Sequence, residues 1–241
     1  MTRKVNVPIL IALVSACTAF AQESPTATPS PTPEEFATPS PTLEQTPSAP
    51  PTRTVRLSFV PPPLEGTISL GIYDGNGKLV RVLHHEAELN EFTIGADALV
   101  TQWDGKNDDG ANLPAGKYHA RGYLVGHFTV EDLGQASFPA MENNAIPNVK
   151  VKLIPNPLRN DRRSIVDLGI GFDNDGSYLK TIDDLPLFTV SETPNLIRAL
   201  ITKKSEKSVD VWQDDGAAVH QFRVSNVDQM MAFDCGEFEL K

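Results

Sequence analysis

Aspartates gathered in three short turns are the side chains in this sequence best suited to chemistry, because calcium prefers oxygen ligands clustered in such loops. The first turn holds Asp104, Asp108 and Asp109, and the other two lie at residues 173–176 and 213–216. None of them has the glutamate that closes the twelve-residue calcium loop. Plain hairpin turns therefore compete with calcium as the explanation, and the first turn is the best calcium candidate.

The other reactive residue types form no known catalytic pattern. The five histidines show no metal-ligand spacing, and there is neither a Gly-x-Ser-x-Gly motif nor a phosphate-binding glycine loop. Cys235 lies in an apolar run beside Asp234 and Glu237, which favours a buried small side chain over a reactive thiol. We predict a protein that is not an enzyme, with no catalytic residue and no cofactor other than a weakly bound calcium ion.

The N-terminus has the three parts of a signal peptide over residues 1–21. Arg3 and Lys4 are followed by an apolar stretch and by Ala19-Phe20-Ala21, a small-x-small cleavage site. The apolar stretch is shorter than the roughly 20 residues of a membrane span. We therefore expect an extracellular, cell-surface or periplasmic protein. A second interpretation is a lipoprotein, because the residues ending at Cys17 resemble a lipobox and would place a lipid on that thiol.

Charge limits the possible partners. The net charge is −10, and removal of residues 1–21 leaves 19 basic against 31 acidic residues, or −12. Such a chain repels nucleic acid and anionic membranes. The expected partner is a protein or a cell-envelope component, and contact with a membrane is expected only through a lipid at Cys17.

Residues 22–53 are predicted to be a disordered linker rich in Pro, Thr and Ser. The hexapeptide Ala27–Thr32 recurs as Ala37–Thr42. Proline removes amide donors and fixes φ, so neither helix nor sheet can propagate here. At about 3.1 Å per residue an extended linker could span on the order of 90 Å.

Residues 54–125 are predicted to be a module of antiparallel strands. Apolar residues alternate at Val55, Leu57 and Phe59, and again from Ile68 to Ile72. The turn at residues 74–77 reads Asp-Gly-Asn-Gly, which suits a hairpin. These features predict strands with one face in a hydrophobic core.

Two motifs of this module resemble the Ig-like domain of flagellar hook-capping (FlgD-type) proteins, similar to modules of many secreted bacterial proteins. One motif runs from Ser69 to Arg81, and the other contains Trp103-Asp104-Gly105-Lys106 and Leu113-Pro114-Ala115-Gly116-Lys117-Tyr118. The resemblance implies an Ig-like β-sandwich for adhesion, spacing or assembly. The motif residues expected in or beside its structural core are Trp103, Tyr118, Gly116 and Ile72.

Residues 126–241 are predicted to be a second β-rich region. Phe172–Gly176 aligns with Trp212–Gly216 at an offset of 40 residues, and apolar alternation surrounds both segments. A hairpin repeat of this length is the period of a propeller blade. Only about two units fit, so the alternatives are a small sandwich or a partial propeller.

The sequence as a whole predicts an all-β, exported, non-catalytic module for binding, scaffolding or surface display. An alternative is a fragment of, or accessory to, a larger secreted protein or hydrolase, in which the Ig-like part is an anchoring or sorting module. A third is a hydrolase whose site lies in residues 126–241.

Overall fold

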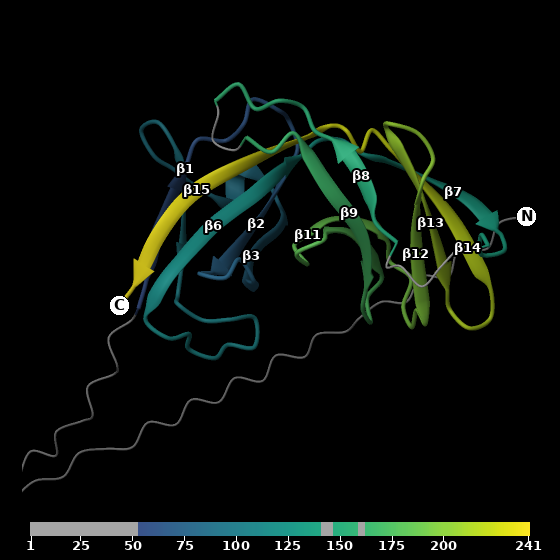
Figure 1. Cartoon of the computed structure of the whole chain (residues 1–241), viewed down its shortest axis with the longest axis horizontal. Coiled ribbons are helices and arrows are strands. Elements are labelled where there is room, and N and C mark those ends of the chain that lie inside the picture. Colours follow the sequence, from purple (N-terminus) through teal and green to yellow (C-terminus); the bar gives the residue numbers. More distant parts are fainter. Residues whose placement is uncertain (1–52, 141–146, 159–161) are drawn as a thin grey trace, which may run out of the picture. The chain divides into compact units, whose positions relative to one another are not determined.

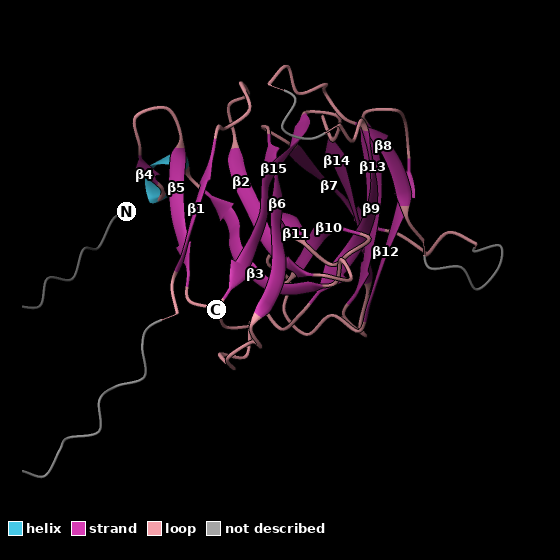
Figure 2. Ribbon diagram, turned by 60° about the vertical axis from the view of Figure 1, so that its left-hand side comes forward, coloured by secondary structure: helices cyan, strands magenta, loops and turns pink. Residues whose placement is uncertain are grey.

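Strands make up almost all of the regular structure in the computed structural model, which describes residues 53–140, 147–158 and 162–241. Within these ranges there are fifteen strands and one turn of 3-10 helix, Leu89–Glu91 (Figures 1 and 2). The all-β prediction is confirmed. The predicted signal peptide with Cys17, and the predicted linker up to residue 52, lie outside the described residues. No helix in the described ranges is long and apolar enough to cross a membrane.

A four-stranded antiparallel sheet in the order β15-β6-β2-β3 forms the centre of the fold. Its strands are β2 (Thr67–Asp74), β3 (Leu79–Ala87), β6 (Gly116–Val125) and β15 (Met230–Leu240). The interior of β2 is buried at every position, although alternation predicts one buried face. This central sheet is therefore covered on both sides.

A three-stranded sheet packs on one face of the central sheet and completes the first sandwich. Its order is β1-β5-β4, with β1 (Val55–Phe59), β4 (Thr93–Ile94) and β5 (Leu99–Trp103). Ile68, Leu70 and Ile72 of β2 are fully buried in the cluster between the two sheets. These are alternate residues of one strand, so their side chains share one face. The predicted apolar alternation is seen here.

Two further four-stranded sheets make up the second sandwich. One has the order β11-β10-β9-β8 and the other β12-β13-β14-β7. The first contains β8 (Val149–Lys152), β9 (Ile165–Phe172), β10 (Ser177–Thr181) and β11 (Pro186–Ser191). The second contains β7 (Thr129–Gln135), β12 (Arg198–Lys203), β13 (Ser208–Asp214) and β14 (Val219–Ser225). Both contribute to one hydrophobic cluster, which is a sandwich arrangement.

The predicted repeat corresponds to two hairpins, one in each sheet of the second sandwich. The β9–β10 hairpin turns at residues 173–176, and the β13–β14 hairpin turns at residues 215–218. Gln213 of β13 is buried, and it bonds to Ser177 of β10 and to Ser191 of β11. This polar link joins the two sheets beside the turns.

The last strand returns to the first sandwich. Figure 1 shows β15 beside β6, and the register pairs Met230 with Val125 and Leu240 with Gly116. The amide of Gly126 donates to the carbonyl of Gln229 at 2.7 Å, where the chain leaves and re-enters this sheet. The second sandwich is thus inserted between two paired strands, whereas the sequence prediction placed all of residues 126–241 in one region. Pairing between segments so far apart leaves no local pattern in the sequence.

The two sandwiches share a core and several polar contacts. Tyr123 and Val125 of β6 belong to the same hydrophobic cluster as the second sandwich. Arg121 pairs with Asp183, and its guanidinium lies 3.9 Å from the centre of the Tyr73 ring. Burial, aided by the charge of Asp183, raises the pKa of Tyr73 above its usual value. The central sheet therefore serves both sandwiches.

Candidate binding groove between the two sandwiches

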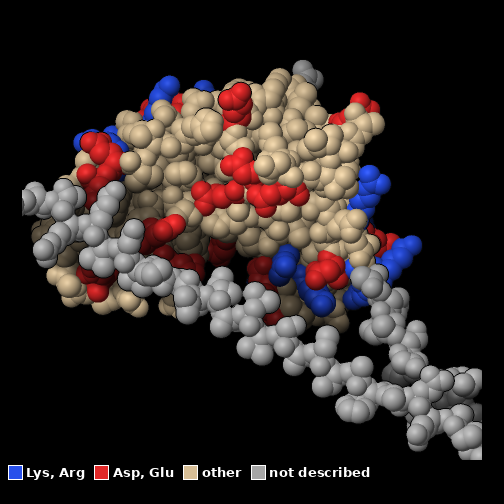
Figure 3. Space-filling view, turned by 180° about the vertical axis from the view of Figure 1, so that it is seen from behind, with Lys and Arg blue, Asp and Glu red and all other residues tan. Residues whose placement is uncertain are grey.

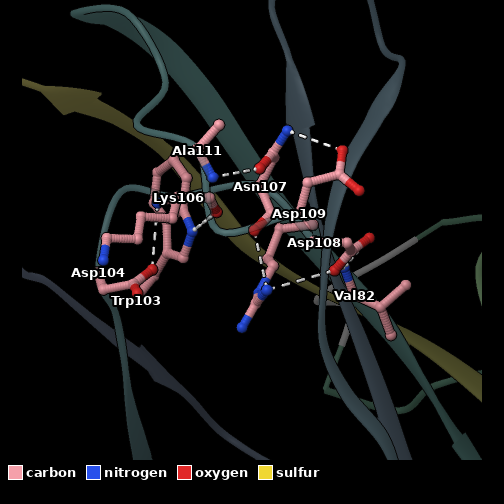
Figure 4. A network of polar contacts seen from close by, with 9 residues as sticks. Val82, Trp103, Asp104, Lys106, Asn107, Asp108, Asp109 and Ala111 are labelled. Carbon is pink, nitrogen blue, oxygen red and sulfur yellow. Dashed lines mark hydrogen bonds and ion pairs between the residues drawn. The ribbon is translucent and has the colours of Figure 1, made fainter.

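The predicted calcium loop uses its carboxylates in separate structural contacts (Figure 4). Asp104 accepts a hydrogen bond from the amide of Lys106 at 3.1 Å. Asp108 accepts from the amide of Val82 on β3 at 3.0 Å, and Asp109 accepts from the side chain of Asn107 at 3.4 Å. Each carboxylate therefore serves a turn or a strand edge.

The side chain of Arg81 links this loop to β3. Arg81 donates to the carbonyl of Asn107 at 2.9 Å and lies 3.6 Å from Asp108. Across the described ranges, no three His, Cys, Asp or Glu side chains come close enough together to hold a metal ion. The structure does not bring Asp104, Asp108 and Asp109 together as a set of ligands.

The aspartates of the other two turns also cap backbone amides. Asp173 accepts from the amides of Asp175 and Gly176, and Asp215 accepts from those of Ala217 and Ala218. These hydrogen bonds lower the pKa of Asp215 below its usual value. Aspartate favours such turns because its side chain bonds to its own backbone two residues further on.

The four residues expected in the core lie in the first sandwich. Trp103 is fully buried, and its ring contacts Tyr118 edge-on with centroids 5.2 Å apart. Its indole N–H donates to the carbonyl of Lys106 at 2.8 Å. Ile72 is fully buried in the same cluster, and Gly116 begins β6.

A groove of about 490 Å³ opens where the two sandwiches meet. It is formed by three segments, which lie within residues 65–67, 86–90 and 125–128, and by Phe188 of β11. Its lining residues are Glu65, Gly66, Thr67, Glu86, Glu88, Leu89, Asn90, Val125, Gly126, His127, Phe128 and Phe188. This size falls within the range of about 300–1,000 Å³ that is usual for ligand pockets.

The groove has an apolar side and an acidic side. Phe128 and Phe188 contact each other with ring centroids 5.0 Å apart. Glu65 and Glu88 are exposed, and Glu86 is partly buried. Oε2 of Glu86 accepts from the amide and the hydroxyl of Thr189, at 3.0 and 2.6 Å. Glu86 is thereby fixed in place, with a positive backbone φ of 49°.

A second hollow adjoins the groove. It has a volume of about 510 Å³ and shares Glu65, Gly126 and His127 with the first. Pro63, Leu64, Asn226 and Gln229 complete its lining. We call these two adjoining hollows together the junction trough.

The junction trough and the first described residue lie at opposite ends of the central sheet. Arg53 donates to the carbonyl of Lys241 at 2.6 Å and to that of Leu113 at 2.7 Å. These partners adjoin the end of the sheet where Leu240 pairs with Gly116. Thr67 and Val125, which line the groove, pair with each other at the other end. Ten residues of β6 separate the two ends by about 30 Å.

Comparison with known proteins gives no relative: no family model, no curated protein and no solved structure matches this chain.

Sequence reasoning did not find the groove. Its carboxylates lie at a loop, at the end of β3 and at the start of the 3-10 turn, and its aromatic side chains come from β11 and from the segment after β6. No motif links Glu65, Glu86 and Phe188 along the chain. The composition gave one signal, an excess of acidic residues, which did not say where they gather.

Proposed function

We propose that this chain is an exported, non-catalytic β-module that binds a protein or cell-envelope component through the junction trough. The observation that supports this most is the position of the groove at the end of the central sheet opposite to Arg53. A module attached through residues preceding Arg53 would present the trough on its far side.

The walls of the trough are held in place before a ligand binds. Four of the groove's twelve lining residues lie in strands, the others lie in the loops and the 3-10 turn beside these strands, and Thr189 fixes Glu86 across the junction. Walls held in this way lose little conformational freedom when a ligand binds, which favours affinity. The FlgD-type resemblance agrees with a binding or assembly role and stays a prediction.

Co-sedimentation of the full chain with isolated cell envelopes tests the proposal. Leu89 lies on the groove and is 41% exposed, so Leu89→Trp should fill the groove without disturbing the core. The control is Ala115→Trp, since Ala115 is exposed in the loop before β6, at the other end of the sheet. We expect Leu89→Trp to reduce the bound fraction severalfold and the control to bind like wild type. Equal binding by all three proteins would contradict the proposal.

A further inference from the structure

We infer that the junction trough accepts a lysine or arginine side chain carried by an extended peptide segment of the partner. This inference rests on the proposed function and adds the chemistry of the ligand. It is supported by charge complementarity, by the apolar surface beside the carboxylates and by the length of the trough.

The groove is lined by three carboxylate side chains, which give it a negative charge. Glu65, Glu86 and Glu88 all line it, and its described lining contains neither Lys nor Arg. His127 is the one basic side chain among these lining residues. Oε2 of Glu86 accepts both hydrogen bonds from Thr189 and lies 3.3 Å from Nε2 of His85, so none of these contacts is made by Oε1. A cation gains from such a site, and an anion is repelled.

The apolar side of the groove fits the remainder of a basic side chain. Lys and Arg carry long aliphatic stems that pack on apolar surface while the charged head reaches polar groups. The contacting rings of Phe128 and Phe188, with Leu89 nearby, offer that surface. Aromatic faces also attract cations directly.

The length of the trough favours a peptide over a small cation. The second hollow adjoins the groove at Glu65 and His127, and Asn226 and Gln229 also line it. A basic side chain in the groove would leave room for neighbouring residues of the same segment in the second hollow. The chain's own residues 22–52 fit poorly, because they contain four glutamates and no Lys or Arg.

The whole sequence has ten more acidic than basic residues. Figure 3 shows acidic side chains gathered across the middle of one face of the molecule, with Lys and Arg toward its edges. Such a distribution attracts basic partners over a distance and is screened by salt.

Isothermal titration of the full chain with the capped peptide Ala-Leu-Lys-Leu-Ala tests the inference. The comparison peptides carry acetyl-lysine or glutamate at the central position. We expect the lysine peptide to bind at least about tenfold more tightly than either, since only it pairs with the carboxylates. The double variant Glu65→Gln, Glu88→Gln should weaken lysine-peptide binding about tenfold. The matched control Asp109→Asn, Glu239→Gln removes the same charge from exposed positions at the other end of the sheet and should bind like wild type.

Three outcomes would each overturn the inference. They are equal binding of the lysine and acetyl-lysine peptides, equal binding by both double variants, and no binding of the lysine peptide at millimolar concentration. Envelope binding separates this failure from that of the proposed function. If Leu89→Trp abolishes envelope binding and Glu65→Gln, Glu88→Gln does not, the trough is the binding site but its ligand is not basic. If Leu89→Trp has no effect, the proposed function fails as well.

Discussion

Trp103 fills the space between the two sheets of the first sandwich, where its ring contacts Tyr118 and Phe238. A buried indole needs a partner for its N–H, and the carbonyl of Lys106 supplies one three residues further on. The turn that carries the aspartates of Figure 4 is thus held partly by the side chain that precedes it.

Replacing Trp103 with alanine should lower the free energy of unfolding by about 3–5 kcal/mol, because it empties a large buried site. Chemical denaturation of the full chain measures this. Gln102→Ala is the control, since Gln102 is exposed on the same strand. A wild-type midpoint for Trp103→Ala would show that the ring contributes nothing to the core.

Cys235 should be unreactive in the native protein. Burial, with a smaller effect from Asp234, raises the pKa of its thiol to about 12, so almost no thiolate exists at pH 8. In a chain carrying Cys17→Ser, we expect a thiol reagent to label Cys235 slowly under native conditions and rapidly in denaturant.

The same pKa shift has a consequence for stability. Because the folded thiol holds its proton more tightly, its contribution to stability is complete below the unfolded pKa of about 9. It is lost as the pH rises from there toward 12. Rapid labelling of the native protein at pH 8 would contradict both statements.

At the scale of single strands, Gly122 lets β6 and β2 lie together. A Cβ atom at this position would come within 2.3 Å of the carbonyl oxygen of Ser69 and 2.8 Å of the Phe233 ring. We expect Gly122→Ala to cost about 1–3 kcal/mol of stability through overpacking.

Gly75→Ala is the matched control for this substitution. A Cβ on Gly75 would meet its nearest neighbour at 3.8 Å, an ordinary contact, so we expect little change in the thermal midpoint. Similar midpoints for the two variants would show that the strands can separate to admit a methyl group.

The pairing of β15 with β6 predicts which segments fold together. Residues 54–125 lack β15, so we expect this fragment to show no cooperative unfolding transition. Joining Gly126 to Gln229 through a two-residue turn should restore one, because these residues already share a 2.7 Å hydrogen bond. Circular dichroism during thermal unfolding distinguishes the two chains. A cooperative transition in the 54–125 fragment would contradict this account of the first sandwich.

Local sequence patterns predicted the strands and turns, but they did not predict which distant strands pair. The turn after Asp74 was predicted because Gly and Asn follow it, and Asp74 indeed accepts from the amides of Asn76 and Lys78. The alternation of β2 predicted one buried face, but Tyr73 lies buried on the other face beside Arg121. That second burial depends on the inserted sandwich, which local alternation cannot reveal.

The candidate site was harder to predict for the same reason. The aspartates of the first turn are close together in sequence, so they stood out, yet Asp104 and Asp108 accept from backbone amides and Asp109 accepts from the side chain of Asn107. The groove residues are spread over more than a hundred positions, and only the meeting of two sandwiches brings Glu86 near Phe188. Recognition surfaces of this kind depend on tertiary packing.

At the scale of the folded unit, two sandwiches share one central sheet and are linked by paired charges and by hydrogen bonds across the junction. Arg121 with Asp183, and Glu86 with Thr189, hold the second sandwich against the first. The trough lies at this joint, and Arg53 lies at the far end of the sheet. The binding role that we propose for the trough rests on this position at the joint, opposite to the end that carries Arg53.

Hydrogen–deuterium exchange of the full chain, with and without isolated cell envelopes, tests this claim most directly. We predict that binding slows exchange at residues 64–67, 86–90 and 125–128, three segments that line the trough. Exchange in the loop at residues 104–115, at the other end of the sheet, should stay unchanged. Protection of that loop without protection of the trough would contradict the account.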